Sequence, residues 1–237
     1  MDYVVVYALT LFLVYSLVSI LTNRSSRRYS AEVYLFVLRR PQLILKAVLP
    51  LSGIGLTLAV LFWASEAVPG GGVLRLSWLS WFASGTGDGP VPESGTNIVA
   101  LPLSVPLLAP VFAVVLLAAL PVLALMEERV FREGTDGGLN ALRRSVVFGL
   151  AHCLVGVPLA VGLALSVGGL YFSRQYAIGE REASETEGAV HDGGRAPYPL
   201  ADPPDGRGVN RAAVHHTAYN VLVLGLVGLL ALLAALL

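Results

Sequence analysis

The chain has very little of what soluble domains use for their surfaces and cross-links. Its 237 residues include one cysteine, Cys153, one lysine, Lys46, and only 14% charged side chains. A single cysteine excludes an intramolecular disulfide and a cysteine-based zinc site. Sixteen basic residues balance sixteen acidic ones, so we expect no nucleic-acid partner. The composition is 55% hydrophobic with a mean hydropathy of +0.71, which is typical of an integral membrane protein.

Long apolar runs recur along the sequence. A membrane-spanning helix needs about 20 mostly apolar residues, and five runs reach or approach that length. They cover approximately residues 3–21, 43–64, 98–126, 145–172 and 212–236. The arginines that follow the first run predict a cytoplasmic position for that end. We therefore predict an all-α fold, a polytopic helical bundle of about five to six membrane segments in the cell membrane.

Polar stretches divide these runs into two regions. Residues 1–97 are predicted to hold the N-terminal membrane helices and an extracytoplasmic loop rich in Gly, Pro and Ser. Residues 98–237 form the second region, which contains a polar insertion at 177–211. Four glutamates and four prolines fall within this insertion. We expect it to be disordered or loosely ordered at the surface.

Two adjacent glutamates and an arginine end the third apolar run. Ionisable groups at the edge of hydrocarbon are costly to place, so they indicate a functional site. On a helix, Glu128 and Arg132 are one turn apart and can pair, whereas Glu127 projects about 100° away. A carboxylate in an apolar setting can act as a general base near neutral pH. The alternative is an ordinary helix end that meets the cytosol.

The last two apolar runs carry histidines. His152 lies inside the fourth run, one turn after Phe148, and His216 begins the last run, one turn before Asn220. Asn and His both donate hydrogen bonds, so His216 and Asn220 can stabilise an oxyanion. Each residue also has a structural alternative. His152 can make a hydrogen bond between helices, Phe148 can pack in the core, and His216 and Asn220 can cap a helix at the interface.

These motifs are Glu-Glu-x3-Arg, Phe-x3-His and His-x3-Asn, in that order. As an ordered set they resemble the CPBP family, the Abi/CAAX-type intramembrane proteases, whose best-known members are the type II CAAX prenyl endopeptidases. The likeness runs from about Ala109 to Leu224. The segment Gly168–Phe172 is also similar to the glycine-rich helix before the last histidine of that family. The resemblance implies that residues 98–237 are a catalytic region.

The resemblance further implies an intramembrane endopeptidase. Glu127 and His152 would activate a water molecule that attacks a peptide carbonyl. His216 and Asn220 would stabilise the resulting oxyanion. The expected partners are membrane lipid and a peptide or prenylated protein substrate, with no nucleic acid.

Three other side chains are expected to have supporting roles. The resemblance implies that Glu128 and Arg132 hold the site together as an ion pair. Phe148, one turn before His152 on the same helix face, is placed to form a wall of the pocket. We predict that no cofactor is needed. The alternative is a zinc-dependent protease, in which three groups and a water would bind the metal. Its ligands would be Glu127, His152 and His216.

The fold must meet one condition for this chemistry. Glu127 ends the third run on the cytoplasmic side, so a single straight helix through 145–172 would place His216 about 30 Å away. We therefore predict a helical break near Gly156–Pro158. Members of the family usually have more helices here and lack the 177–211 insertion. A non-catalytic immunity or binding protein with the same fold is the alternative function.

Overall fold

The computed structural model describes residues 15, 18–67, 72, 74, 108–187 and 206–236 of the chain. Within these residues all regular structure is helical, as predicted, and no strand occurs. The principal elements are α2 (Arg24–Leu38), α3 (Pro41–Ala67), α6 (Leu108–Arg132), α7 (Gly138–Ala151), the 3₁₀ turn η3 (His152–Val155), α8 (Leu159–Glu187) and α9 (Arg207–Leu236).

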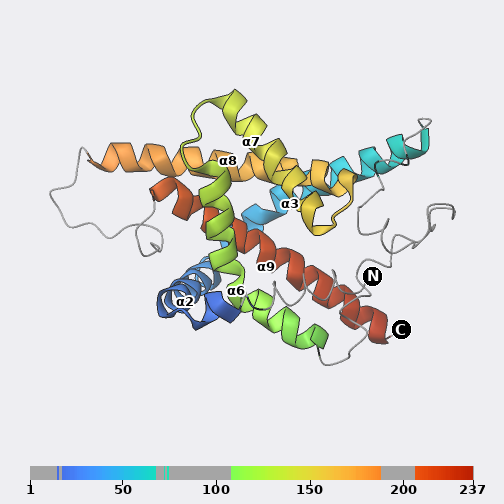
Figure 1. Cartoon of the computed structure of the whole chain (residues 1–237), viewed down its shortest axis with the longest axis horizontal. Coiled ribbons are helices and arrows are strands. Elements are labelled where there is room, and N and C mark those ends of the chain that lie inside the picture. Colours follow the sequence, from blue (N-terminus) through green and yellow to red (C-terminus); the bar gives the residue numbers. More distant parts are fainter. Residues whose placement is uncertain are drawn as a thin grey trace.

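Helix α8 lies at the centre of the packing (Figure 1). It contacts α7, α9 and α3, while α9 also packs on α6 and α3, and α2 packs on α6. One core cluster joins α2, α6 and α9 through buried residues such as Val33, Leu125 and Val214. A second joins α3, α7, α8 and α9 and includes Phe148 and Phe172. The two clusters thus bring together helices that lie far apart in the sequence.

The predicted break in the fourth apolar run is confirmed. Helix α7 ends at Ala151, the 3₁₀ turn follows, and α8 begins at Leu159. Gly156 has a φ of 92°, a left-handed conformation that glycine adopts without steric penalty. Pro158 follows and cannot donate a backbone hydrogen bond. The chain therefore reverses here, and α7 packs directly along α8.

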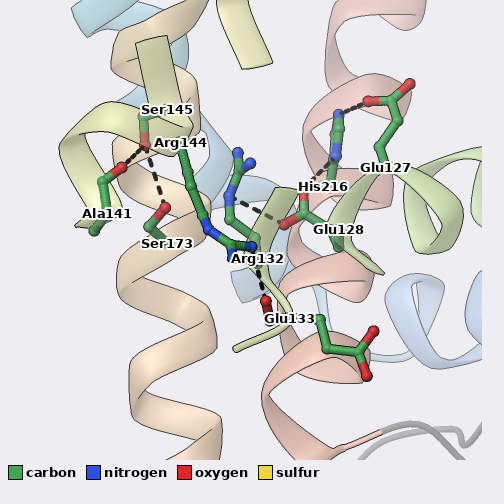
Figure 2. Close-up of polar contacts among 9 residues, drawn as sticks. All are labelled: Glu127, Glu128, Arg132, Glu133, Ala141, Arg144, Ser145, Ser173 and His216. Carbon is green, nitrogen blue, oxygen red and sulfur yellow. Dashed lines mark hydrogen bonds and ion pairs between the residues drawn. The ribbon is translucent and has the colours of Figure 1, made fainter. Parts of the chain in front are cut away.

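Small residues allow α7 and α8 to approach closely. A Cβ atom built on Gly149 would lie 2.2 Å from the carbonyl oxygen of Gly162 and 2.7 Å from the backbone nitrogen of Ser166. Real Cβ contacts are never so short, and backbone atoms cannot move aside without shifting the helix. The hydroxyls of Ser145 on α7 and Ser173 on α8 lie 3.2 Å apart and hydrogen-bond across the same interface (Figure 2).

We expect Gly149→Ala to destabilise the protein by about 1–3 kcal/mol, because overpacking a tight contact forces backbone shifts. Gly225→Ala is the matched control. Gly225 is also helical, and nothing lies within 4 Å of its added Cβ, so this change should be neutral or stabilising. Thermal unfolding in detergent measures both. Equal unfolding temperatures for Gly149→Ala and the wild type would contradict the close approach.

The prediction of disorder across 177–211 is wrong at both ends. Helix α8 continues to Glu187, and α9 begins at Arg207. Glu180 accepts a hydrogen bond of 2.9 Å from the backbone of Gly208, and Glu182 forms an ion pair with Arg211. These acids stabilise helical structure because they have partners on α9, instead of being solvated on a loop. The prediction for residues 188–205 lies outside the described residues.

Two of the described helices are long and apolar enough to cross a membrane. They are Pro41–Ala67 and Arg207–Leu230. Large apolar side chains are exposed on both, such as Leu56 and Trp63 on α3 and Leu229 and Leu230 on α9. Exposed apolar surface of this extent is unusual for a soluble monomer. The chain therefore has helices suited to membrane association.

Candidate active site

His216 lies between two glutamates (Figure 2). Its Nδ1 is 2.8 Å from Oε1 of Glu128, and its Nε2 is 3.7 Å from Oε2 of Glu127. Helix α6 supplies both carboxylates and α9 supplies the imidazole, 88 residues later in the chain. A carboxylate can only accept, so Nδ1 donates its proton to Glu128. Nε2 is then the ring nitrogen that faces Glu127.

Glu128 also pairs with Arg132, at the spacing that the sequence suggested. The Nε of Arg132 lies 3.5 Å from Oε2 of Glu128, and both side chains are fully buried. The guanidinium carbon is 4.6 Å from the centre of the Phe148 ring. Among the described residues, the guanidinium nitrogens have no hydrogen-bond partner. Glu128 is thus the carboxylate that compensates a buried cation while it also holds His216.

Aromatic rings enclose the imidazole of His216. The Phe172 ring stacks on it, with centroids 4.3 Å apart and planes 19° apart. The Phe148 ring meets it edge-on at 5.8 Å. Neither the contact with Phe172 nor the bond between Glu128 and His216 was anticipated from the sequence. The only sequence signal for Phe172 was its place at the end of the glycine-rich segment 168–172.

His152 occupies the first position of the 3₁₀ turn at the break. Its Nδ1 lies 2.8 Å from the carbonyl oxygen of Phe148, which can only accept, so Nδ1 carries a proton. In the neutral ring Nε2 then has a lone pair available. The ring packs edge-on against Phe148 at 4.8 Å, so Phe148 is the shared neighbour of both histidines. No hydrogen bond joins His152 to Glu127 in the described structure.

Asn220 lies one turn after His216 on α9 and is half-buried. The described residues give its side chain no hydrogen bond. His215, next to His216, is not part of this group, because its Nδ1 hydrogen-bonds the hydroxyl of Tyr171 at 2.9 Å. The structure therefore brings together Glu127, Glu128, Arg132, Phe148 and His216. It leaves His152 at the edge of this group and Asn220 one turn away.

The residues expected for a zinc site do not fit a metal centre as they are arranged. Within residues 18–67, 108–187 and 206–236, no three His, Cys, Asp or Glu side chains are grouped closely enough to hold a metal ion. A zinc site needs such ligands at about 2.0–2.3 Å from one point. Glu127 and His216 approach each other, but His152 does not complete the set.

Comparison of the chain with protein-family models, curated proteins and solved structures finds no significant match. A functional proposal for this chain accordingly depends on its own side chains and their arrangement.

Proposed function

We propose that this protein is an intramembrane endopeptidase of the CPBP type. The observation that carries the proposal is the buried contact of Glu128 with His216, which directs the Nε2 of that histidine toward Glu127. A carboxylate beside a correctly oriented imidazole is the arrangement that general acid–base catalysis requires. This group of charged side chains lies near the end of α6, next to apolar surface. Charges have a high free-energy cost in such a place, so their presence favours a functional role.

In the proposed reaction Glu127 removes a proton from a water molecule as the water oxygen attacks the substrate carbonyl. His152 helps to orient this water through its Nε2. The carbonyl oxygen becomes an oxyanion, which accepts hydrogen bonds from the amide of Asn220 and from Nε2 of His216 when that nitrogen is protonated. The proton held by Glu127 then passes to the leaving amine as the C–N bond breaks. Glu128 acts through His216 and is a positioning residue.

The proposed setting is a multi-pass protein of the cell membrane. The apolar helices α3 and α9 support this membrane setting. Together with the apolar runs at 3–21, 98–126 and 145–172, they would give the chain five to six membrane segments. The proposed substrate is a membrane-associated peptide or a prenylated protein. It reaches the site from the cytoplasmic side, where the arginines near Glu127 are predicted to lie.

The test is cleavage of a membrane peptide by the purified chain in liposomes, with Asn220→Ala as the informative variant. We expect this variant to lose about 10²–10³-fold in kcat, because a lost oxyanion donor costs about 2.7–4 kcal/mol. Its unfolding temperature should be unchanged, since the described structure gives the Asn220 side chain no hydrogen bond. A loss smaller than tenfold would exclude Asn220 as an oxyanion donor. Its position in the interior of α9 already excludes the alternative that it caps a helix. A wild-type chain that binds the peptide without cleaving it would favour a non-catalytic binding protein.

A further inference from the structure

Helix α6 contains a fully buried proline in its interior, Pro121, six residues before Glu127. Proline has no N–H, so it cannot donate the α-helical hydrogen bond to the carbonyl oxygen of Leu117, four residues earlier. The helix nevertheless continues from Leu108 to Arg132, and it changes direction part-way along (Figure 1). A proline inside a helix is a common cause of such a bend. The carbonyl of Leu117 therefore needs a donor from outside the hydrogen-bond ladder of α6.

The hydroxyl of Tyr34 on α2 supplies that donor. It forms a hydrogen bond with the carbonyl oxygen of Leu117, 83 residues later in the chain. A carbonyl oxygen can only accept, so the hydroxyl donates. In membrane proteins, neighbouring helices commonly satisfy the backbone groups that a proline frees. Tyr34 thus bonds the one carbonyl that loses its helical partner to Pro121.

Helix α2 also contacts α6 on the other side of the bend. Val33 of α2 is buried in one core cluster with Val122 and Leu125, which follow Pro121. Tyr34, the next residue of α2, bonds α6 before the proline. Because α2 is attached to α6 both before and after the bend, it can fix the angle between the two halves.

The half of α6 that follows the bend carries the carboxylates that meet His216. Glu127 lies about 9 Å of helix beyond Pro121, so a change of about 10° in the bend would displace it by about 1.6 Å. A misplacement of about 1 Å can lower a reaction rate about 10²-fold. The angle of α6 at Pro121 therefore affects how Glu127 is placed relative to His216.

We propose that the hydroxyl of Tyr34 fixes the bend of α6 at Pro121 and thereby positions Glu127, the proposed general base. Tyr34 acts through the backbone of α6, so it is a positioning residue. Its effect on the reaction rate rests on the proposed function, whereas its effect on the shape of α6 does not.

The first test measures cleavage of a membrane peptide in liposomes. Tyr34→Phe keeps the ring and removes only the hydroxyl. We expect kcat to fall about 10- to 100-fold with little change in KM, because the base is misplaced during the reaction. Pro121→Ala restores the N–H that can bond Leu117 within the helix, so adding Tyr34→Phe to this variant should change kcat less than about twofold. Thermal unfolding shows that each variant is folded.

Pro50→Ala is the matched control, because Pro50 is also buried inside a helix but lies on α3. In this background Tyr34→Phe should lose as much kcat as it does in the wild type. An equal loss in the Pro121→Ala background would overturn the proposal, since Tyr34 would then act independently of that proline. Unchanged kcat in Tyr34→Phe alone would also overturn it.

The second test measures the bend by double electron–electron resonance and needs no catalysis. Spin labels are attached at Val114→Cys and Val130→Cys, two exposed positions on either side of Pro121, in a Cys153→Ala chain. In a straight helix these positions are about 24 Å apart, and a bend shortens that distance. Tyr34→Phe should shift or broaden the distance distribution when Pro121 is present and leave it unchanged in the Pro121→Ala background.

The two tests separate the role of Tyr34 from the proposed function. Identical distance distributions with and without the hydroxyl would overturn the proposal, whatever the cleavage rate. If the wild-type chain does not cleave the peptide but its bend depends on Tyr34, proteolysis is rejected and the role of Tyr34 in shaping α6 is retained.

Discussion

Replacement of Glu127 by Gln is expected to abolish peptide cleavage while the fold persists. The change keeps the size of the side chain but removes the carboxylate that is the proposed base for the attacking water. General bases contribute about 10²–10⁴-fold to the rate, so kcat should fall by that factor. The Glu127 side chain is 37% exposed, and its contact with His216 is long at 3.7 Å. Surface changes of this kind alter stability by about 0.5 kcal/mol at most.

The matched control for this result is Glu133→Gln. Glu133 lies just beyond the end of α6 and is exposed, and it is its backbone carbonyl, not its side chain, that accepts the hydrogen bond from Arg144 (Figure 2). We expect this variant to keep the wild-type rate. Initial rates of peptide cleavage in liposomes measure both variants. Residual cleavage by Glu127→Gln within tenfold of the wild type would remove Glu127 from the role of base.

Glu128→Leu is expected to have the largest effect on stability. The carboxylate is fully buried and compensates the equally buried guanidinium of Arg132. Removal of one partner leaves an uncompensated charge in the interior, which costs about 3–5 kcal/mol. The same change removes the acceptor of the His216 Nδ1 proton, so cleavage should also be lost. Chemical or thermal unfolding in detergent measures the stability.

The double variant Glu128→Leu/Arg132→Met separates these two effects. Replacement of a whole buried ion pair by apolar side chains is often neutral or stabilising, so most of the lost stability should return. Cleavage should not return, because the imidazole of His216 still lacks the group that orients it. If the double variant recovers activity together with stability, Glu128 acts only as a partner for Arg132 and does not position the histidine.

Local features of this fold were predictable from the sequence because their causes are local. Apolar runs of sufficient length predict α3 and α9, and Gly156 with Pro158 predicts the break between α7 and α8. The pairing of Glu128 with Arg132 follows from one turn of helix. These features depend on residues within a few positions of one another.

The remaining features depend on contacts between distant residues, which a single sequence does not reveal. Glu180 and Glu182 resemble a solvated charge run until α9 brings Gly208 and Arg211 beside them. Phe172 is one of many aromatic residues in an apolar run until it stacks on His216. The order of Glu128 and His216 along the chain is evident from the sequence, but their hydrogen bond is not. The two side chains meet only because the chain reverses between α7 and α8.

The stacking of Phe172 on His216 has an entropic consequence for the proposed catalysis. An imidazole fixed on one face by a parallel ring, at its edge by Phe148 and at Nδ1 by a buried carboxylate has lost its rotational freedom during folding. The entropic cost of orienting it is therefore included in the free energy of folding. In the proposed reaction, binding of the substrate would not have to supply this cost again.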